Sequence, residues 1–368
     1  MTAIEFLDYF DELDDPRAPN VVYPADEILF TTLCAIICGS DGWGDIEDFG
    51  EAKLLFLQQY LPYKDGIPSD DTFRRFFRAL EPEQFKKCFL KWVKNLDIYL
   101  NNNIIAIDGK TSRRSHDGDK KALHTVSAFA AESGIILGQQ KTDEKSNEIT
   151  AIPQLIDLLD INGSIVTIDA MGTQRNIANK IIDKEADYIL ALKGNQSSLN
   201  HDVRLFFEDN DLTQHLDKYE ETDGGHGRIE VRKCTATDDI AWLKERHDWA
   251  GLKSIIRIDS QVDRNGKNTL ETRYYISSLA SDTQKLLHSI RSHWSIENSL
   301  HWVLDMSFND DQSRIRKQNA PENMMIIKHL AINMIRQAKE KGESIRRLRK
   351  KAGWDVDTLK RILQHNST

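Results

Sequence analysis

The chain has 368 residues, of which 40% are hydrophobic and 29% are charged, so it can bury a large core and hold more than one domain. No apolar run is long enough to cross a bilayer, and the acidic start lacks the basic region of a secretory signal. The four cysteines form no paired CxxC pattern, so we expect the reduced core cysteines of a cytosolic protein and no zinc site.

The net charge of −9 hides an asymmetry along the chain. Residues 1–99 carry 10 Lys and Arg against 19 Asp and Glu, and residues 100–311 carry 25 against 34. Residues 312–368 reverse the balance, with 14 against 5. A basic end on an acidic body suggests a polyanionic partner, although a solvated helix face would give the same count.

Residues 1–98 are predicted to form a helical domain, which is a candidate for DNA binding. The apolar run 28–38 is typical of a buried helix, and a second helix is expected after Ser69, a natural N-cap. The phenylalanines of this second helix share one face. Its arginines project elsewhere, either as a solvated edge or toward DNA phosphates. They are Arg74, Arg75 and Arg78.

Residues 99–199 alternate between predicted strands and helices. A strand carrying Asp108 comes first and is followed by two antiparallel strands, a helix, a strand carrying Asp169, another helix and a last strand. The expected ranges after the first strand are 122–130, 134–142, 147–159, 164–169, 174–184 and 188–193. This order predicts an α/β fold with a mixed sheet of the RNase H-like, retroviral-integrase type.

The remaining residues complete and extend this core. Residues 200–280 are predicted to be a β-rich insertion, with strands at 228–235, 254–262 and 270–278. One amphipathic helix is expected over 283–304, so residues 281–311 rejoin the core. Residues 312–368 are predicted to be a basic helical segment, broken at Gly342 and Gly353.

Three carboxylates are candidate metal ligands: Asp108, Asp169 and Glu297. The two aspartates end predicted strands, where open α/β sheets place their chemistry, and the glutamate lies on the long helix. A pair of Mg²⁺ ions about 3.5–4 Å apart takes oxygen ligands and catalyses displacement at phosphorus. Taken singly, each residue also fits a turn or an exposed helix charge; taken together in this order, they favour a two-metal site.

Basic and polar residues near these carboxylates are candidates for contact with DNA. His293 and His301 each lie one helical turn from Glu297 and are candidates to orient it or to touch DNA. A hairpin loop and a solvated helix end remain the alternatives for the candidates in the insertion and at the C-terminal end. The full set of candidates is Lys110, Arg113, Arg114, Lys193, Asn195, His226, Arg228, Arg291, His293, Asn298, Arg346, Arg347, Arg349 and Lys350.

Several of these motifs carry a resemblance to a known family. They are residues 106–110, 167–174, 190–196, 226–230 and the run 293–305. On these residues the chain resembles the ISAs1 family of insertion-sequence transposases, a branch of the IS4-like DDE transposases that includes the H-repeat-associated proteins. The resemblance covers nearly the whole chain, and residues 67–74 resemble the domain that precedes the catalytic core.

The resemblance implies Mg²⁺-dependent cleavage and transfer of DNA strands, with Mn²⁺ as a substitute and no covalent protein–DNA intermediate. It implies double-stranded DNA as the partner, a homodimer on DNA, no membrane, and a bacterial cytoplasmic location on the nucleoid. Asp108, Asp169 and Glu297 carry over as the DDE triad and as metal ligands.

The sequence departs from the wider pattern, which has Tyr and Arg before the Glu and Lys after it. Ile290, His293 and Leu304 stand at those positions. Alternatives to Glu297 as third ligand therefore stay open: Asp305, Asp310 and Asp311. The alternative functions are a catalytically inactive DNA-binding protein and a host-adopted nuclease derived from such a transposase.

Overall fold

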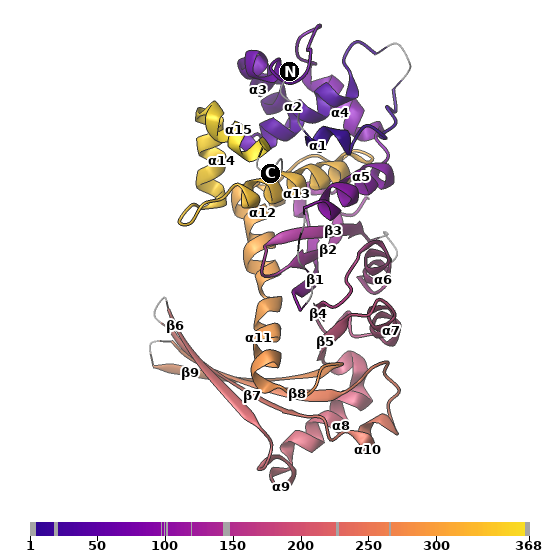
Figure 1. Cartoon of the computed structure of the whole chain (residues 1–368), viewed down its shortest axis with the longest axis vertical. Helices are drawn as coiled ribbons and strands as arrows, with labels where there is room; N and C mark the ends of the chain where they lie inside the picture. Colours follow the sequence, from indigo (N-terminus) through magenta and orange to yellow (C-terminus); the bar gives the residue numbers. More distant parts are fainter. Residues whose placement is uncertain are drawn as a thin grey trace.

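The computed structural model describes residues 5–17, 21–96, 98, 100, 102–118, 120–142, 148–225, 228–264 and 266–364. Figure 1 shows a helical end that contains both chain termini, a central sheet with helices on its faces, and a curved set of strands at the opposite end. None of the described helices is both long and apolar enough to span a membrane.

The central sheet has the predicted RNase H-like order, β3-β2-β1-β4-β5. The first three strands form an antiparallel meander, and β4 and β5 then run parallel to β1. Their bounds are β1 (Ile104–Thr111), β2 (His124–Ala130), β3 (Ile135–Lys141), β4 (Ile165–Ile168) and β5 (Asp187–Leu192). The crossover helices are α6 (Glu148–Leu158) and α7 (Arg175–Asp183).

Residues 197–277 extend this sheet. β9 pairs antiparallel with β5, so the strands of this segment and of the core make one continuous nine-stranded sheet. The strands are β6 (Lys218–Gly225), β7 (Arg228–Thr237), β8 (Ser254–Arg264) and β9 (Lys267–Ser277). The helices are α8 (Ser197–Glu208), α9 (Asn210–Thr213) and α10 (Ala241–Lys244). β6 was not expected from the sequence, because most of its side chains are exposed and it lacks an apolar alternation.

Segments from both ends of the chain form one helical body (Figure 1). The N-terminal helices are α1 (Glu5–Asp8), α2 (Ala25–Cys38), α3 (Trp43–Leu57), α4 (Asp70–Ala79) and α5 (Pro82–Lys94). The C-terminal helices are α13 (Ala320–Gln337), α14 (Ile345–Trp354) and α15 (Val356–Gln364). α13 contacts α2, α4, α5 and β3, so this C-terminal helix packs against both the N-terminal helices and the sheet.

Two buried asparagines explain how α13 is fixed. The Asn333 side chain accepts from the backbone N–H of Ile136 and donates to its carbonyl, at 2.9 Å each, so it stands in for a neighbouring strand beside β3. Asn323 donates to the carbonyls of Phe77 and Leu80, also at 2.9 Å. These bonds tie one helix to both the sheet and the N-terminal helices.

The long helix predicted over 283–304 is interrupted. α11 (Thr283–His293) is followed by η3 (Ile296–His301), a π-helical turn, and then by α12 (Trp302–Ser307). Such turns insert one extra residue into an α-helix and change the direction in which later side chains point. A 3₁₀ turn, η4 (Asp310–Gln312), follows α12, and another, η1 (Arg113–Ser115), follows β1.

A buried ion pair joins η4 to α13. Lys328 Nζ lies 2.7 Å from Asp310 Oδ1, and Ser112 Oγ donates to Asp310 Oδ2 at 2.7 Å. The side chains of Lys328 and Asp310 are 4% and 3% exposed. Removing one partner of such a pair leaves an uncompensated buried charge.

We therefore expect Lys328→Met to lower the free energy of unfolding by about 3–5 kcal/mol, measured by guanidinium denaturation. The matched control is Lys317→Met, because Lys317 pairs with Asp117 at 2.8 Å but is 60% exposed. We expect the control to lose less than about 1 kcal/mol. Equal losses in the two variants would contradict a structural role for the buried pair.

Candidate metal and nucleic-acid site

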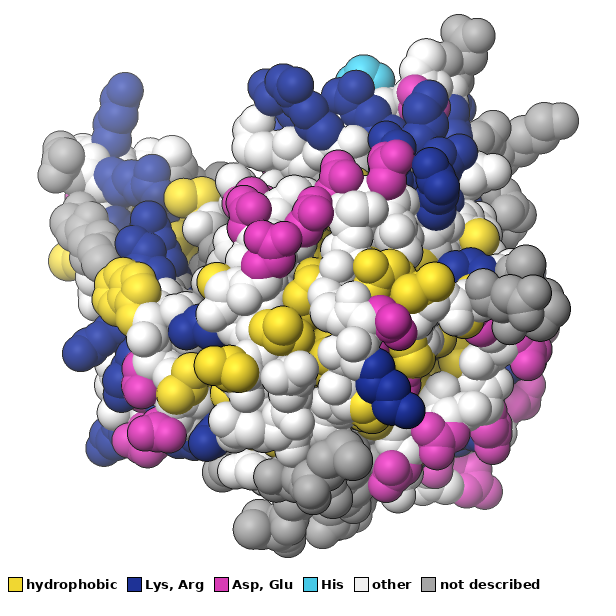
Figure 2. Space-filling view, turned by 90° about the horizontal axis from the view of Figure 1, so that it is seen from above, with side chains coloured by type: hydrophobic (Ala, Val, Ile, Leu, Met, Phe, Trp, Pro, Cys, Tyr) yellow, Lys and Arg dark blue, Asp and Glu magenta, His cyan; other side chains and the backbone are white. Residues whose placement is uncertain are grey.

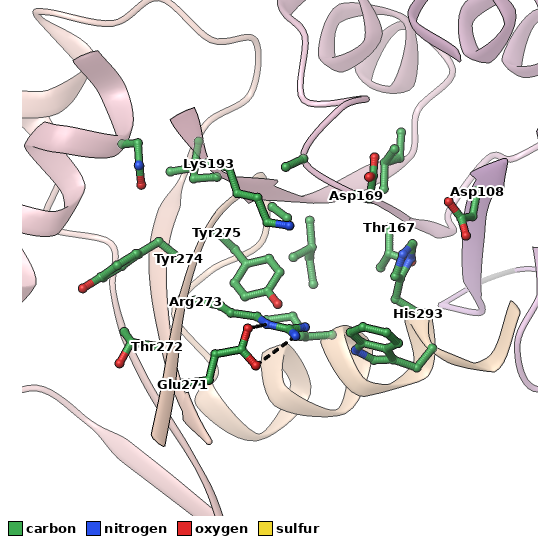
Figure 3. A pocket seen from close by; sticks show the side chains of 18 of the residues that line it. Asp108, Thr167, Asp169, Lys193, Glu271, Thr272, Arg273, Tyr274, Tyr275 and His293 are labelled. Carbon is green, nitrogen blue, oxygen red and sulfur yellow. Dashed lines mark hydrogen bonds and ion pairs between the residues drawn. The ribbon is translucent and has the colours of Figure 1, made fainter. Parts of the chain in front are cut away.

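Two aspartates lie side by side at one edge of the central sheet. β1 and β4 are parallel, and Ile107 pairs with Ile168, so the next residue of each strand is a carboxylate. Asp108 is the fifth residue of β1, and Asp169 follows the end of β4. Figure 3 shows both carboxylates at the same edge of one cavity. The predicted convergence of two strand-end carboxylates is therefore present.

Glu297 reaches the same cavity from η3. This cavity has a volume of about 610 Å³ and is lined by Asp108, Asp169 and Glu297 among others. The preceding helix α11 is anchored beside them by His293, whose Nδ1 lies 3.1 Å from Thr167 Oγ1 on β4. The three predicted ligands are thus brought together from two strands and a helix.

The loop after Asp169 is held in one conformation. Asp169 Oδ1 accepts the backbone N–H groups of Met171 and Gly172, at 3.0 and 3.3 Å. Asn195, a predicted DNA contact, donates instead to the carbonyl of Ala170 at 2.5 Å. A β-carbon at Gly172 would lie 2.3 Å from Ile168 Cγ2, so only glycine permits this close approach of loop and strand.

Gly109 serves a similar purpose on the neighbouring strand. A β-carbon there would lie 2.1 Å from Glu148 Oε1 and 2.6 Å from His124 Nε2. His124 and Glu148 pair with each other at 2.8 Å across this position. Sequence reasoning did not find this pair, because its partners lie 24 residues apart and meet only when β2 and α6 are in place.

The electrostatics of the cavity favour a bound cation. Burial raises the pKa of the Asp108 carboxyl to about 7. A hydrogen bond from the backbone N–H of Gly109 opposes this rise, and the negative charges of Glu148, Asp169 and Glu297 add to it. A carboxylate surrounded by other carboxylates is stabilised in its ionised form by a divalent ion.

The donor set fits a hard cation. The three carboxylates offer oxygen ligands, which Mg²⁺ prefers, and the nearby imidazoles are disfavoured in their charged form. Burial lowers the pKa of His293. Burial, together with the positive charge of Lys110, lowers the pKa of His301 to about 4. These residues could therefore hold Mg²⁺ or Mn²⁺ without a competing positive charge from histidine.

The alternative third ligands form a separate cluster. Carboxylate oxygens of Asp305, Asp310 and Asp311 lie within 4.8 Å of one another. Lys110 Nζ lies 2.6 Å from Asp305 and 3.6 Å from Asp311, and Arg113 Nε lies 3.3 Å from Asp311. This cluster is neutralised by cations of the chain itself, whereas Glu297 borders the cavity.

The same contacts show which of the basic residues after Asp108 remain available to bind DNA. The Lys110 side chain is 9% exposed and engaged by aspartates, so it is not available to a phosphate in this arrangement. Arg113 is 81% exposed despite its contact with Asp311. Arg114 is exposed as well. Lys193 is exposed, and Figure 3 shows its ammonium group pointing into the cavity.

Other candidates gather in a second cleft of about 530 Å³ between α11 and the insertion strands. Glu297 borders this cleft too, together with Arg228, Arg291 and Asn298. Arg291 pairs with Glu221 and, at 2.9 Å, with Asp223. Arg228 lies 3.4 Å from Glu230. His226 lies outside the described residues.

The basic run of α14 is divided between surface and core. Arg346, Arg347 and Lys350 are exposed. Arg349 is 5% exposed, donates to the carbonyl of Ile36 at 2.6 Å and stacks 3.8 Å above the ring of Phe308. Arg349 is therefore a packing residue, and the expectation that it contacts DNA does not fit its burial. Figure 2, which looks down on this helical end, shows Lys and Arg side chains gathered along the upper and left margins of the view.

The packing of Gly172 yields a test of the site. We expect Gly172→Ala to lower the free energy of unfolding by roughly 1–3 kcal/mol, because the added methyl group meets Ile168 and Ile152. Gly194→Ala is the control, since a β-carbon there has no neighbour within 4 Å, and it should change stability by less than about 0.5 kcal/mol. Denaturant unfolding measures both, and an unchanged Gly172→Ala protein would contradict the close approach.

Comparison with known proteins identifies the family. The model described as Transposase DDE domain matches residues 100–334, and the DDE_Tnp_1-associated model matches residues 7–93. Two Escherichia coli relatives are named as candidate transposases. YncI of strain O157:H7 is 41% identical over 99% of this chain and 95% of its own length. The H repeat-associated YhhI of strain K12 is 40% identical over 99% and 98%.

A solved structure, a piggyBac transposase in a synaptic complex with hairpin DNA, aligns with 95% of this chain and 74% of that chain. Its TM-score of 0.43 and 10% identity are too low to support any further argument. The family assignment does not depend on that likeness. On the evidence of the family model and of relatives matched over nearly their full length, the chain belongs to the DDE transposase family.

Proposed function

We propose that the chain is an active transposase that cleaves DNA strands at the ends of an insertion sequence and joins them to target DNA. The observation that carries the proposal is the convergence of Asp108, Asp169 and Glu297 on one cavity. Within the family we assign the chain to the ISAs1 branch. The substrate would be double-stranded DNA, and a homodimer would hold two ends together.

The three carboxylates would hold two Mg²⁺ ions, with Mn²⁺ as a substitute. Bound Mg²⁺ would activate the attacking oxygen and stabilise the leaving oxygen at phosphorus. Asp108 would supply carboxylate oxygens to this metal site from β1. The backbone N–H groups of Met171 and Gly172 donate to Oδ1 of Asp169, which orients this carboxylate and would leave Oδ2 for a metal ion. Glu297 would complete the set from η3.

Positive side chains around the cavity would position the phosphodiester. Lys193 points into the cavity from the end of β5 (Figure 3). Arg113 and Arg114 lie exposed after the end of β1. Arg228, Arg291 and Asn298 line the adjoining cleft, and the exposed Arg346, Arg347 and Lys350 would meet DNA farther from the cut. Such a substrate would place the protein on the nucleoid of a bacterial cell.

Strand cleavage of DNA that carries the borders of the element tests the proposal. With Mg²⁺ present, we expect Asp108→Asn, Asp169→Asn and Glu297→Gln each to slow nicking by at least about 100-fold, because metal stabilisation of the transition state is worth several kcal/mol. Binding in a gel-shift assay should persist. Asp305→Asn is the control, and we expect it to keep at least about a tenth of the nicking rate, because Asp305 lies in the separate cluster.

The outcomes separate the competing functions. Nicking by Asp108→Asn at the rate of the unaltered chain would refute the proposed catalytic site. DNA binding without nicking by any of the proteins would indicate a non-catalytic binding protein. Nicking without strand joining would indicate a nuclease. Loss of nicking in Asp305→Asn, with Glu297→Gln unaffected, would move the third ligand to the aspartate cluster.

A further inference from the structure

His301 faces the first aspartate of the site and not the glutamate that precedes it on the helix. Its Nδ1 lies 3.7 Å from Asp108 Oδ2, and its side chain is 14% exposed. The contact crosses from the last residue of η3 to the middle of β1, and these two elements pack together. The sequence spacing suggested a contact with Glu297, one helical turn away, but His301 ends the π-helical turn and its Nδ1 approaches β1 instead.

The surroundings of the ring decide which nitrogen carries a proton. Nε2 is buried and has no hydrogen-bond partner among the described residues. A buried donor left unpaired is rarer than a buried acceptor left unpaired. A neutral ring therefore carries its proton on Nδ1, and a charged ring carries one there as well. In either state an N–H group points toward the Asp108 carboxylate.

The separation between His301 Nδ1 and Asp108 Oδ2 is short enough for the Nδ1–H group to approach the carboxylate. At 3.7 Å the contact is longer than a hydrogen bond. The χ2 torsion of an aspartate is broad, so rotation of the Asp108 carboxylate can shorten the separation between Oδ2 and Nδ1. Lys110, two residues farther along β1, does not compete for this oxygen, because Asp305 holds its ammonium group at 2.6 Å.

We propose that His301 is a positioning residue that fixes the orientation of the Asp108 carboxylate for metal binding through its Nδ1–H group. The inference rests on the proposed function, since it assumes that Asp108 is a metal ligand. Side chains that hold a ligand in place typically contribute 10–100-fold to metal affinity. His301 would do so without placing a lysine or arginine charge beside the cations.

Mn²⁺ affinity of the full chain without DNA, measured by titration calorimetry, tests the inference. We expect His301→Leu to weaken Mn²⁺ binding by about 10–100-fold. His301→Asn should stay within about threefold of the unaltered chain, because its side-chain amide nitrogen takes nearly the place of Nδ1. His301→Gln carries its amide near the position of Nε2 and should behave like His301→Leu.

Thermal unfolding without metal separates positioning from packing. Loss of Mn²⁺ affinity in the Gln variant but not in the Asn variant, with similar unfolding temperatures, supports the inference even if the Leu variant does not fold. The inference is overturned if all three His301 variants bind Mn²⁺ as tightly as the unaltered chain does while Asp108→Asn loses Mn²⁺ binding. That result leaves the proposed function intact. Unchanged Mn²⁺ affinity and nicking in Asp108→Asn would instead refute the proposed function itself.

Discussion

The parallel pairing of β1 with β4 is the constraint on which the site depends. The strands are buried up to Ile107 and Ile168, and because these two residues pair, the aspartate that follows each of them lies at the same edge of the sheet. Two like charges at one sheet edge repel each other, but the hydrogen bonds and apolar burial of the strands hold them there. Burial raises the pKa of Asp108, and the negative charges of Glu148, Asp169 and Glu297 add to this rise, so a divalent cation would favour the ionised form of its carboxyl.

The third carboxylate depends on how the helices are anchored at both ends. His293 fixes the end of α11 against Thr167, beside the second aspartate. Within η3, the carbonyl of Ser299 accepts a hydrogen bond from the guanidinium of Arg336, which also donates to the carbonyl of Gly134, so Arg336 ties the π-helical turn to α13 and to the loop before β3. The helical body built from both chain ends is therefore the support that sets the direction of Glu297, in addition to any contact it makes with DNA.

Local patterns predicted the parts of the fold that local physics determines. The β-branched runs before Asp108 and Asp169 form strands, and the phenylalanines of α4 are buried as their shared face required. The interruption at 296–301 has no such signal, because one extra residue in a helix barely changes the apolar spacing. The pairing of Asn333 with Ile136, and of His124 with Glu148, depends on elements that meet only after folding.

The role of a basic residue is even harder to predict from the sequence, because its side chain can bind DNA, pack in the core or pair with a neighbouring carboxylate. Arg349 is used for packing, and Lys110 and Arg291 are each engaged by two carboxylates of the chain. A phosphate at Arg291 would compete with Glu221 and Asp223 for its guanidinium, so phosphate binding would carry the cost of weakening those pairs. The exposed Lys193 carries no such cost. The strength of the proposed DNA contact would therefore depend on the carboxylates that already pair with each basic side chain, and the number of basic residues in the sequence does not measure it.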